Sequence, residues 1–477
     1  MIAAVARKEF KSIVRDGRFR LLALVCALLI GVAGLNGFQS TLSQARDVAA
    51  AAQAETQNFD NQGDKNPHAA AHFGQFAFRP VLLPSAVDPG ASAFMGSMVW
   101  LEAHRMNLPQ ARPAEDAVGH GRATRLSVAW ALQFIVPLLI MVTAFASIAG
   151  ERDRGTLALS HSQGVSVAGL VLGKLLGIGV SLAIVLVPPL LVCTVLMAWA
   201  SPIIESHGNA SRLGFMTAVY GLYLTGFAAL SLWISLVSKT ARQAFLLLLG
   251  LWLMFTVLVP RVSADLATQL HPTPSATDFW DGIKRGEGAG TQLPADSRAR
   301  IGAIRQQTLK RELDKYGVET AEDLPVNFTA VFLQALEEAD SPIFDHNFDQ
   351  LWQTHEAQRG VQVFASILSP TLAIRSVSAA LAGTDGFAQR HFSLAAEQHR
   401  RKFVAQLNNI QATEGAGARF FVADGERWST LEKFHYESPS TSMVLGRHGF
   451  EILLLIAWAL TPLGLALFSA TRVGVLP

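Results

Sequence analysis

Two histidines in the first part of the chain have a spacing that could hold a metal ion. His68 and His72 are four residues apart in the segment PHAAAHF, which places both imidazoles on one face of a helix. Imidazole nitrogens bind zinc and copper, and Glu102 and His104 could complete the ligand set. The same rings could instead pack and hydrogen-bond inside a folded domain. His68 and His72 are therefore candidate metal ligands, and the pattern alone assigns no cofactor to the chain.

The remaining reactive residue types form no catalytic motif. The stretch nearest to a phosphate-binding loop, Gly169–Leu175, has the wrong spacing and ends in Leu175 where a hydroxyl is required. Zinc-protease and G-x-S-x-G nucleophile motifs are missing from the sequence. Cys26 and Cys193 both fall in predicted membrane helices and offer no disulfide framework. The sequence predicts no enzyme, so ATP and Mg²⁺ would have to be bound by another chain.

The composition is that of an integral membrane protein with large water-exposed parts. Half of the 477 residues are hydrophobic and 16% are charged, against roughly 25% charged in soluble domains. The mean hydropathy is +0.31. The formal net charge of +2 is close to neutral, which argues against nucleic acid as a partner.

Six apolar runs are long enough to cross a bilayer, for which about 20 residues are needed. The predicted spans are residues 21–38, 127–149, 175–200, 215–237, 244–260 and 450–471. Gly173, Gly177 and Gly179 lie in or beside the third run and would allow another helix to approach closely.

Lysines and arginines beside the spans predict the orientation of the chain. They are concentrated in residues 1–20 and in the loops 150–174 and 238–243, whereas the loop 201–214 carries only Arg212. We therefore expect both termini in the cytoplasm, and a multi-pass protein of the bacterial inner membrane.

This orientation places two long segments, 39–126 and 261–449, on the outer side of the membrane. Both are polar enough to fold in water, and each begins and ends beside the same bundle of spans. We expect them to pack together as one mainly helical extracytoplasmic domain. The predicted fold class is an all-α membrane protein with six transmembrane helices.

The apolar stretch Val363–Ala382 could be mistaken for a seventh span. Arg375 at its centre and Pro370 argue against a crossing. A single extra span would also move the C-terminus to the other side of the membrane. We interpret the stretch as an amphipathic helix that lies on the outer membrane surface or on the bundle.

Residues 1–20 have the pattern of an amphipathic helix that lies on an anionic membrane surface. At about 100° per residue, the apolar side chains fall on one side, at Ile2, Val5, Phe10 and Ile13. The basic side chains fall on the opposite side, at Arg7, Lys8, Lys11, Arg15 and Arg18. The alternative is a basic tail beside the first span.

A charged segment follows the second span. Four charged residues end that crossing, because a bilayer interior does not tolerate them; they are Glu151, Arg152, Asp153 and Arg154. Gly155 then breaks the helix, and Thr156 and Leu157 follow. The segment either docks a cytosolic protein or only stops the helix and pairs with lipid headgroups.

The basic N-terminal helix, the six spans and the segment E-R-x-R-G-T-L at Glu151–Leu157 resemble the membrane subunit of an ABC-2 type (type V) ABC exporter. The large split outer domain is similar to that of a subgroup that includes gliding-motility and nitrous-oxide-reductase-maturation transporters. The motif is specific in this topological position, and the resemblance covers the membrane half of the chain.

The resemblance implies a division of labour between subunits. The 150–174 loop would contain a coupling helix that docks on a separate ABC ATPase, with Glu151–Leu157 at the contact. Residues 1–20 would be the elbow helix. Two permease chains, identical or paralogous, would pair and move a substrate outward or out of the membrane. The other hypothesis is a membrane-anchored binding or assembly protein whose extracytoplasmic domain loads a metal or matures a partner.

Overall fold

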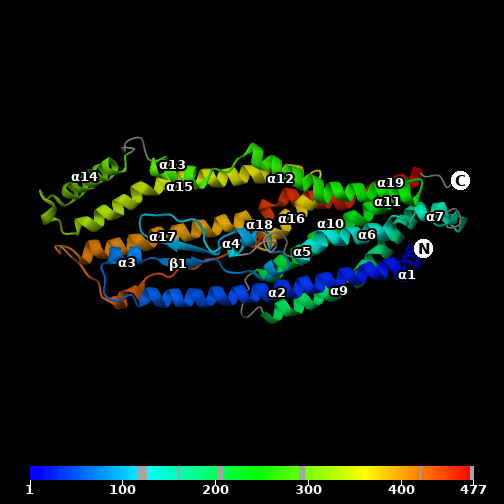
Figure 1. Ribbon diagram of the computed structural model, residues 1–477, viewed down its shortest axis with the longest axis horizontal. Coiled ribbons are helices and arrows are strands. Elements are labelled where there is room, and N and C mark those ends of the chain that lie inside the picture. Colours follow the sequence, from blue (N-terminus) through cyan, green and yellow to red (C-terminus); the bar gives the residue numbers. More distant parts are fainter. Residues whose placement is uncertain are drawn as a thin grey trace.

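The computed structural model describes residues 1–116, 126–157, 162–200, 204, 208–288, 296–418 and 420–472. Long helices run along one axis of an elongated molecule, and the N-terminus and the last helix, α19 (Gly449–Arg472), lie at the same end (Figure 1). We refer to this end as the terminal end. Helices make up 77% of the protein, and the described part contains one two-stranded sheet. The predicted all-α class is confirmed.

Six helices are long and apolar enough to cross a membrane, which confirms the number of predicted spans. They are Gly17–Asp60, Val128–Asp153, Val167–Ala200, Asn209–Val237, Ala241–Leu270 and Gly449–Arg472. The first of these, α2, continues well beyond the apolar run, and Figure 1 shows it extending from the terminal end far toward the other end.

Two of the spans contain a five-residue π-helical turn. The second span consists of α5 (Val128–Trp130), the π-turn η4 (Ala131–Ile135), α6 (Val136–Ala144) and α7 (Ala149–Asp153). The fifth consists of α11 (Ala241–Leu253), the π-turn η5 (Met254–Leu258) and α12 (Val259–Leu270). Pro137 and Pro260 are each the second residue after a turn. Because proline lacks the amide hydrogen and clashes with the preceding turn, the helix widens there instead of breaking.

The helix α10 (Asn209–Val237) is the centre of the bundle. It packs against α19 (Gly449–Arg472), α6 and α9 (Val167–Ala200). Tyr223 and Phe227 of α10 are fully buried, and Trp458 of α19 stacks edge-on against Phe227. In contrast, α9 exposes an apolar stripe with helical spacing at Leu176, Val180, Ile184, Val187 and Leu191, as expected for a lipid-facing surface.

The stretch Val363–Ala382 does not form a span. Helix α15 (Phe328–Ala365) ends inside it, and the short α16 (Pro370–Leu381) begins a new direction and lies against α10 and α19. Tyr220 and Tyr223 of α10 share hydrogen bonds with Ser378 and Thr371 of α16. Of the two predicted locations, α16 therefore occupies the one on the bundle.

The two long polar segments fold together at the end opposite the termini. We call residues 39–116, 271–365 and 386–447 the distal domain; α16 between them belongs to the bundle. Its core joins Phe59 of α2 to Phe403 of α17 (Gly386–Glu414) and to the fully buried Trp428. Its remaining elements are α3 (Pro67–Phe73), β1 (Gln75–Phe78), η1 (Leu83–Ala86), η2 (Ser92–Phe94), β2 (Met98–Leu101), α4 (Pro113–Asp116), α13 (Ala276–Lys284), α14 (Ser297–Tyr316), η6 (Ala321–Asp323), η7 (Gly425–Thr430) and α18 (Thr441–Arg447).

The strands β1 and β2 are antiparallel, with Gln75 opposite Leu101 and Phe78 opposite Met98. Helix α3 precedes β1 and packs on α17. This arrangement brings the chain that leaves β2 next to α3.

At the terminal end, α1 (Ile2–Arg15) lies along α9. A Cβ atom added at Gly173 would lie 2.6 Å from Val5 Cβ, and one at Gly177 would lie 2.7 Å from Glu9 Cβ and 2.9 Å from the Ala6 carbonyl oxygen. Gly179 faces open space. Two of the three glycines therefore permit the contact between α1 and α9.

This contact predicts a difference between two otherwise equal substitutions. Gly177→Val should lower the stability of the protein by about 1–3 kcal/mol, because the side chain would push α1 away from α9. Gly179→Val should change it by less than about 0.5 kcal/mol. Thermal unfolding in detergent measures both, and equal losses for the two variants would contradict this packing.

Candidate functional site

A buried network of opposite charges joins three elements at the terminal end. Lys174 Nζ of α9 lies 2.7 Å from Glu9 Oε2 of α1 and 3.2 Å from Glu151 Oε1 of α7. The side chains of Lys174, Glu9 and Glu151 are 2%, 9% and 8% exposed. Lys8 Nζ lies 3.2 Å from Glu151 Oε1 at the outer edge of the network, and Ser147 Oγ donates to Glu9 Oε1. The four formal charges balance.

Arg152 and Asp153 connect the same segment to the loop between the fourth and fifth spans. The Arg152 guanidinium donates to the carbonyl oxygens of Leu236 and Ser238 at the end of α10, where a cation is favoured by the helix dipole. Asp153 Oδ2 accepts a hydrogen bond of 3.1 Å from the backbone amide of Ala241 at the start of α11. Both residues thus have a structural role within the chain.

The rest of the motif divides into an exposed and a buried part. Arg154, Gly155 and Thr156 are exposed, and Gly155 has a φ of 72° that a residue with a side chain rarely adopts. Thr156 Oγ1 donates to the carbonyl oxygen of Glu151, and Leu157 is buried in the bundle. Residues 158–161, in the middle of the predicted coupling loop, lie outside the described residues. Arg154 therefore presents its charge at the surface of the terminal end.

The basic residues predicted on α1 are exposed, as an interfacial helix requires. These residues are Arg7, Lys8, Lys11 and Arg15. The fifth predicted residue, Arg18, is exposed as well but lies on α2, because α1 ends at Arg15. On the opposite side, Val5 and Ile13 pack against the bundle, whereas Ile2 stays exposed. The burial of Glu9 was not predicted from the sequence. Val5, Glu9 and Ile13 are spaced four residues apart, so they lie on one face of the helix. An acid inside the apolar stripe of a basic helix was the available signal.

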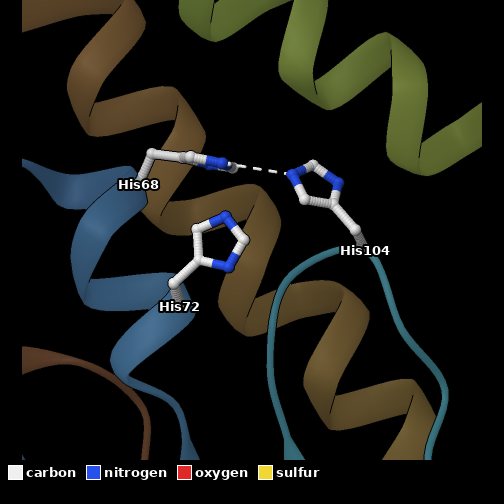
Figure 2. A group of neighbouring side chains, drawn as sticks. All are labelled: His68, His72 and His104. Atoms are coloured by element: carbon white, nitrogen blue, oxygen red, sulfur yellow. Dashed lines mark hydrogen bonds between the residues drawn. The ribbon is translucent and has the colours of Figure 1, made fainter.

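The candidate metal ligands lie far from this network, in the distal domain. The structure brings His68, His72 and His104 together, with one ring nitrogen of each within 4.8 Å of the other two. Figure 2 shows His68 and His72 on one helix and His104 on a separate loop. Glu102 is not part of this group, and its carboxylate accepts a hydrogen bond of 3.0 Å from Asn107 Nδ2. Metal binding itself stays a prediction.

A cavity of about 1350 Å³ lies where the span bundle meets the distal domain. Trp130 and Gln133 of the second span line it, together with residues of α15, α16 and α19. Its ionisable wall residues include Asp88, Arg359, Arg375, Asp385, His448 and Glu451. A cavity of this size with charged side chains in its wall is suited to hold a solute between the span bundle and the distal domain.

His448 connects two acids in the cavity wall. His448 Nδ1 lies 3.1 Å from Glu451 Oε1, and its Nε2 lies 3.8 Å from Asp385 Oδ2, which is an ion-pair distance but too long for a hydrogen bond. Burial lowers the pKa of His448, but Asp385 and Glu451 raise it by more, so the pKa lies above its ordinary value. By contrast, burial lowers the pKa of His355 in the same wall.

The comparison with protein families decides what kind of protein carries these features. The family described as "ABC-2 family transporter protein" matches residues 3–475. The chain belongs to the ABC-2 transporter family. It is a multi-pass membrane protein and a permease of an ABC transporter, a class in which ATP hydrolysis typically resides in an associated ATPase subunit. No curated protein matches the chain.

The buried network of this permease predicts a large cost for removing its lysine. Lys174→Met should destabilise the protein by about 3–5 kcal/mol, because two buried carboxylates would then lack their shared cation. Adding Glu9→Gln should recover a large part of the loss, since the charges again balance. Lys284→Met, which breaks an exposed pair with Asp281, should cost less than about 1 kcal/mol. Thermal unfolding tests this, and a double variant no more stable than Lys174→Met would refute the network.

The raised pKa of His448 predicts a pH dependence of stability. Because the folded pKa exceeds the unfolded one, the stabilisation is complete below about pH 6.5 and is lost as the pH rises through the folded pKa. His448→Gln should therefore flatten the fall in melting temperature above pH 6.5. His355→Gln, in the same wall, should leave that slope unchanged. Melting temperatures measured between pH 6 and 9, in steps of about half a pH unit, test this prediction. If the melting temperature of His448→Gln falls with pH as steeply as that of the unchanged protein, His448 is not the group responsible.

Proposed function

We propose that this permease is the transmembrane subunit of an ATP-driven exporter, powered by a separate ABC ATPase that docks at the terminal end. The observation that carries the proposal is the buried network of Glu9, Lys174 and Glu151. It ties the segment with the family-like motif to α1 and α9 through short ion pairs. A force applied to this segment would therefore move α1, α7 and α9 as one unit.

The exposed and buried halves of the motif suggest separate tasks. Arg154 and Gly155 lie at the surface and would contact the ATPase. Arg152 and Asp153 hold the ends of α10 and α11 and would transmit the movement to the fourth and fifth spans. Glu151 would transmit it to the third span and to the elbow helix α1. The ATPase contact thus reaches most of the bundle through hydrogen bonds and ion pairs.

The proposed orientation follows from charge and from the position of the distal domain. The exposed Arg7, Lys8, Lys11 and Arg15 on α1 suit anionic headgroups of the cytoplasmic leaflet. This orientation puts both termini in the cytoplasm of a bacterial cell and the distal domain outside the inner membrane. The cavity between bundle and distal domain would then receive a substrate that leaves the membrane or the cytoplasm.

We further propose that two permease chains, identical or paralogous, form the transporter. The exposed apolar surfaces of α9 and α11 offer area for a second chain as well as for lipid. The large distal domain supports a relationship to the subgroup with large outer loops, such as gliding-motility and nitrous-oxide-reductase-maturation transporters. The distal domain would handle the substrate or a partner on the outer side.

The docking proposal predicts the effect of reversing one exposed charge. Arg154→Glu should reduce co-purification with the ABC ATPase by about tenfold or more, which corresponds to about 1.4 kcal/mol. The melting temperature of the permease alone should stay unchanged, because Arg154 is exposed. Arg298→Glu, an equal charge reversal on exposed α14 in the distal domain, should leave co-purification intact.

A second readout is the ATPase rate of the assembled transporter. The double variant Arg154→Glu/Gly155→Val should abolish any stimulation of the ATPase by the permease. If the double variant still co-purifies with the ATPase and stimulates it normally, docking at this segment is wrong.

A further inference from the structure

We propose that His68, His72 and His104 form a binding site for a divalent transition-metal ion, of the kind that zinc fills, on the distal domain. Nothing in the transport role requires such a site, so the inference goes beyond the proposed function. It would give the permease an outer-side ligand in addition to its transported substrate.

The three ligands come from two rigid supports. His68 and His72 lie one helical turn apart on α3, whose N-terminus is capped by the side chain of Asn66. His104 lies in the turn after β2 with a φ of 63°, in the left-handed region that few residues other than glycine adopt. Such local strain is retained where the surroundings impose it, and it is concentrated at functional sites. Here it turns the His104 ring toward α3 (Figure 2).

Neighbouring side chains orient the two less exposed imidazoles. His68 Nδ1 lies 3.0 Å from Asn408 Oδ1, and the Asn408 amide nitrogen donates to Gln334 Oε1, which fixes the oxygen toward the histidine. His68 therefore carries its hydrogen on Nδ1 and directs the lone pair of Nε2 away from Asn408. Amide and carboxylate partners of this kind are typical of metal-binding histidines.

His104 is oriented by a carboxylate. Its Nδ1 lies 3.0 Å from Glu337 Oε1, but not in line for a hydrogen bond, so the attraction is mainly electrostatic. The same oxygen accepts the backbone amide hydrogen of His104. Arg400 in turn holds the other Glu337 oxygen at 3.0 Å. The carboxylate beside Nδ1 favours the tautomer with the hydrogen on Nδ1, which leaves the lone pair on Nε2.

These orientations place two lone pairs opposite each other. His68 Nε2 and His104 Nε2 are 3.1 Å apart, and the dashed line in Figure 2 marks this contact as a hydrogen bond, which requires a hydrogen on one of the two nitrogens. Two neutral acceptors at this distance repel each other unless a proton or a metal cation lies between or beside them. In a tetrahedral zinc site with Zn–N distances of about 2.0–2.1 Å, neighbouring nitrogens are about 3.3 Å apart. The pair needs to open by only a few tenths of an ångström.

His72 supplies the third ligand and lies on the solvent-exposed side of the site. Its ring centroid lies 4.8 Å from that of His68 and 5.3 Å from that of His104. The side chain is exposed and can rotate toward the ion without disturbing the core. Three histidines leave the fourth tetrahedral position to water or to a donor group of another molecule. The site would therefore accept an exchangeable ligand from outside.

The proposal is tested on the full-length permease in detergent, without the ATPase, so that its outcome is independent of coupling. After removal of metals with EDTA, Zn²⁺ is titrated against a chromogenic chelator. The unchanged protein should bind Zn²⁺ at a single tight site, and Co²⁺ should give the visible absorption of a tetrahedral site. His68→Ala/His72→Ala should weaken Zn²⁺ binding by about 100-fold or more, beyond the effect of losing an outer-shell partner.

Three further variants separate ligand loss from misfolding. His104→Asn should also remove tight binding, and asparagine tolerates the left-handed backbone. Asn408→Ala should weaken binding by about 10–100-fold through the lost orientation of His68. His435→Ala, an exposed histidine of the same domain, should have no effect. If the unchanged protein binds no Zn²⁺, or if His68→Ala/His72→Ala binds it equally well, the site does not exist.

Discussion

An unpaired charge buried inside a protein is costly, and the terminal end of this permease is arranged around that constraint. Lys174 is nearly inaccessible and lies between Glu9 and Glu151. Neither acid is near the lysine in sequence, so the pairing fixes where α1 and α7 lie relative to α9. Detaching α1 would leave the lysine with one buried partner fewer. The elbow helix is therefore a fixed part of the bundle as well as a surface helix.

The same rule operates in the distal domain. Arg400 of α17 is nearly inaccessible and is held by Glu397 at 2.7 Å and by Glu337 of α15 at 3.0 Å. The guanidinium also donates to the carbonyl oxygen of Glu102, in the turn that carries His104. One buried cation thus joins two long helices to the loop of the third histidine. The position of that loop depends on this buried cation as well as on the apolar packing of Ala103 and Met106.

The sequence was informative where one segment decided its own structure. Each span is an apolar run of sufficient length, and the spacing of His68 and His72 follows from helix geometry. It was less informative where distant segments meet. It was also less informative about the length of the first membrane helix. The apolar run ends near residue 38, whereas the helix continues to Asp60, because alanine- and glutamine-rich segments remain helical outside the apolar run. The acid in the apolar stripe of α1 was a local signal for Glu9, and His104 was a candidate ligand from the sequence. Which side chains these two residues meet depends on tertiary contacts.

Helix α2 gives these separate regions a mechanical connection. Its 44 residues form a rod about 66 Å long at 1.5 Å per residue, which packs on α9 at one end. At the other end Phe59 contacts Phe73, the residue after His72. A rod of this length acts as a lever: tilting it by roughly 5° about its base would sweep its tip through about 6 Å. A small rotation at the terminal end would thus become a displacement of ångströms beside the three histidines.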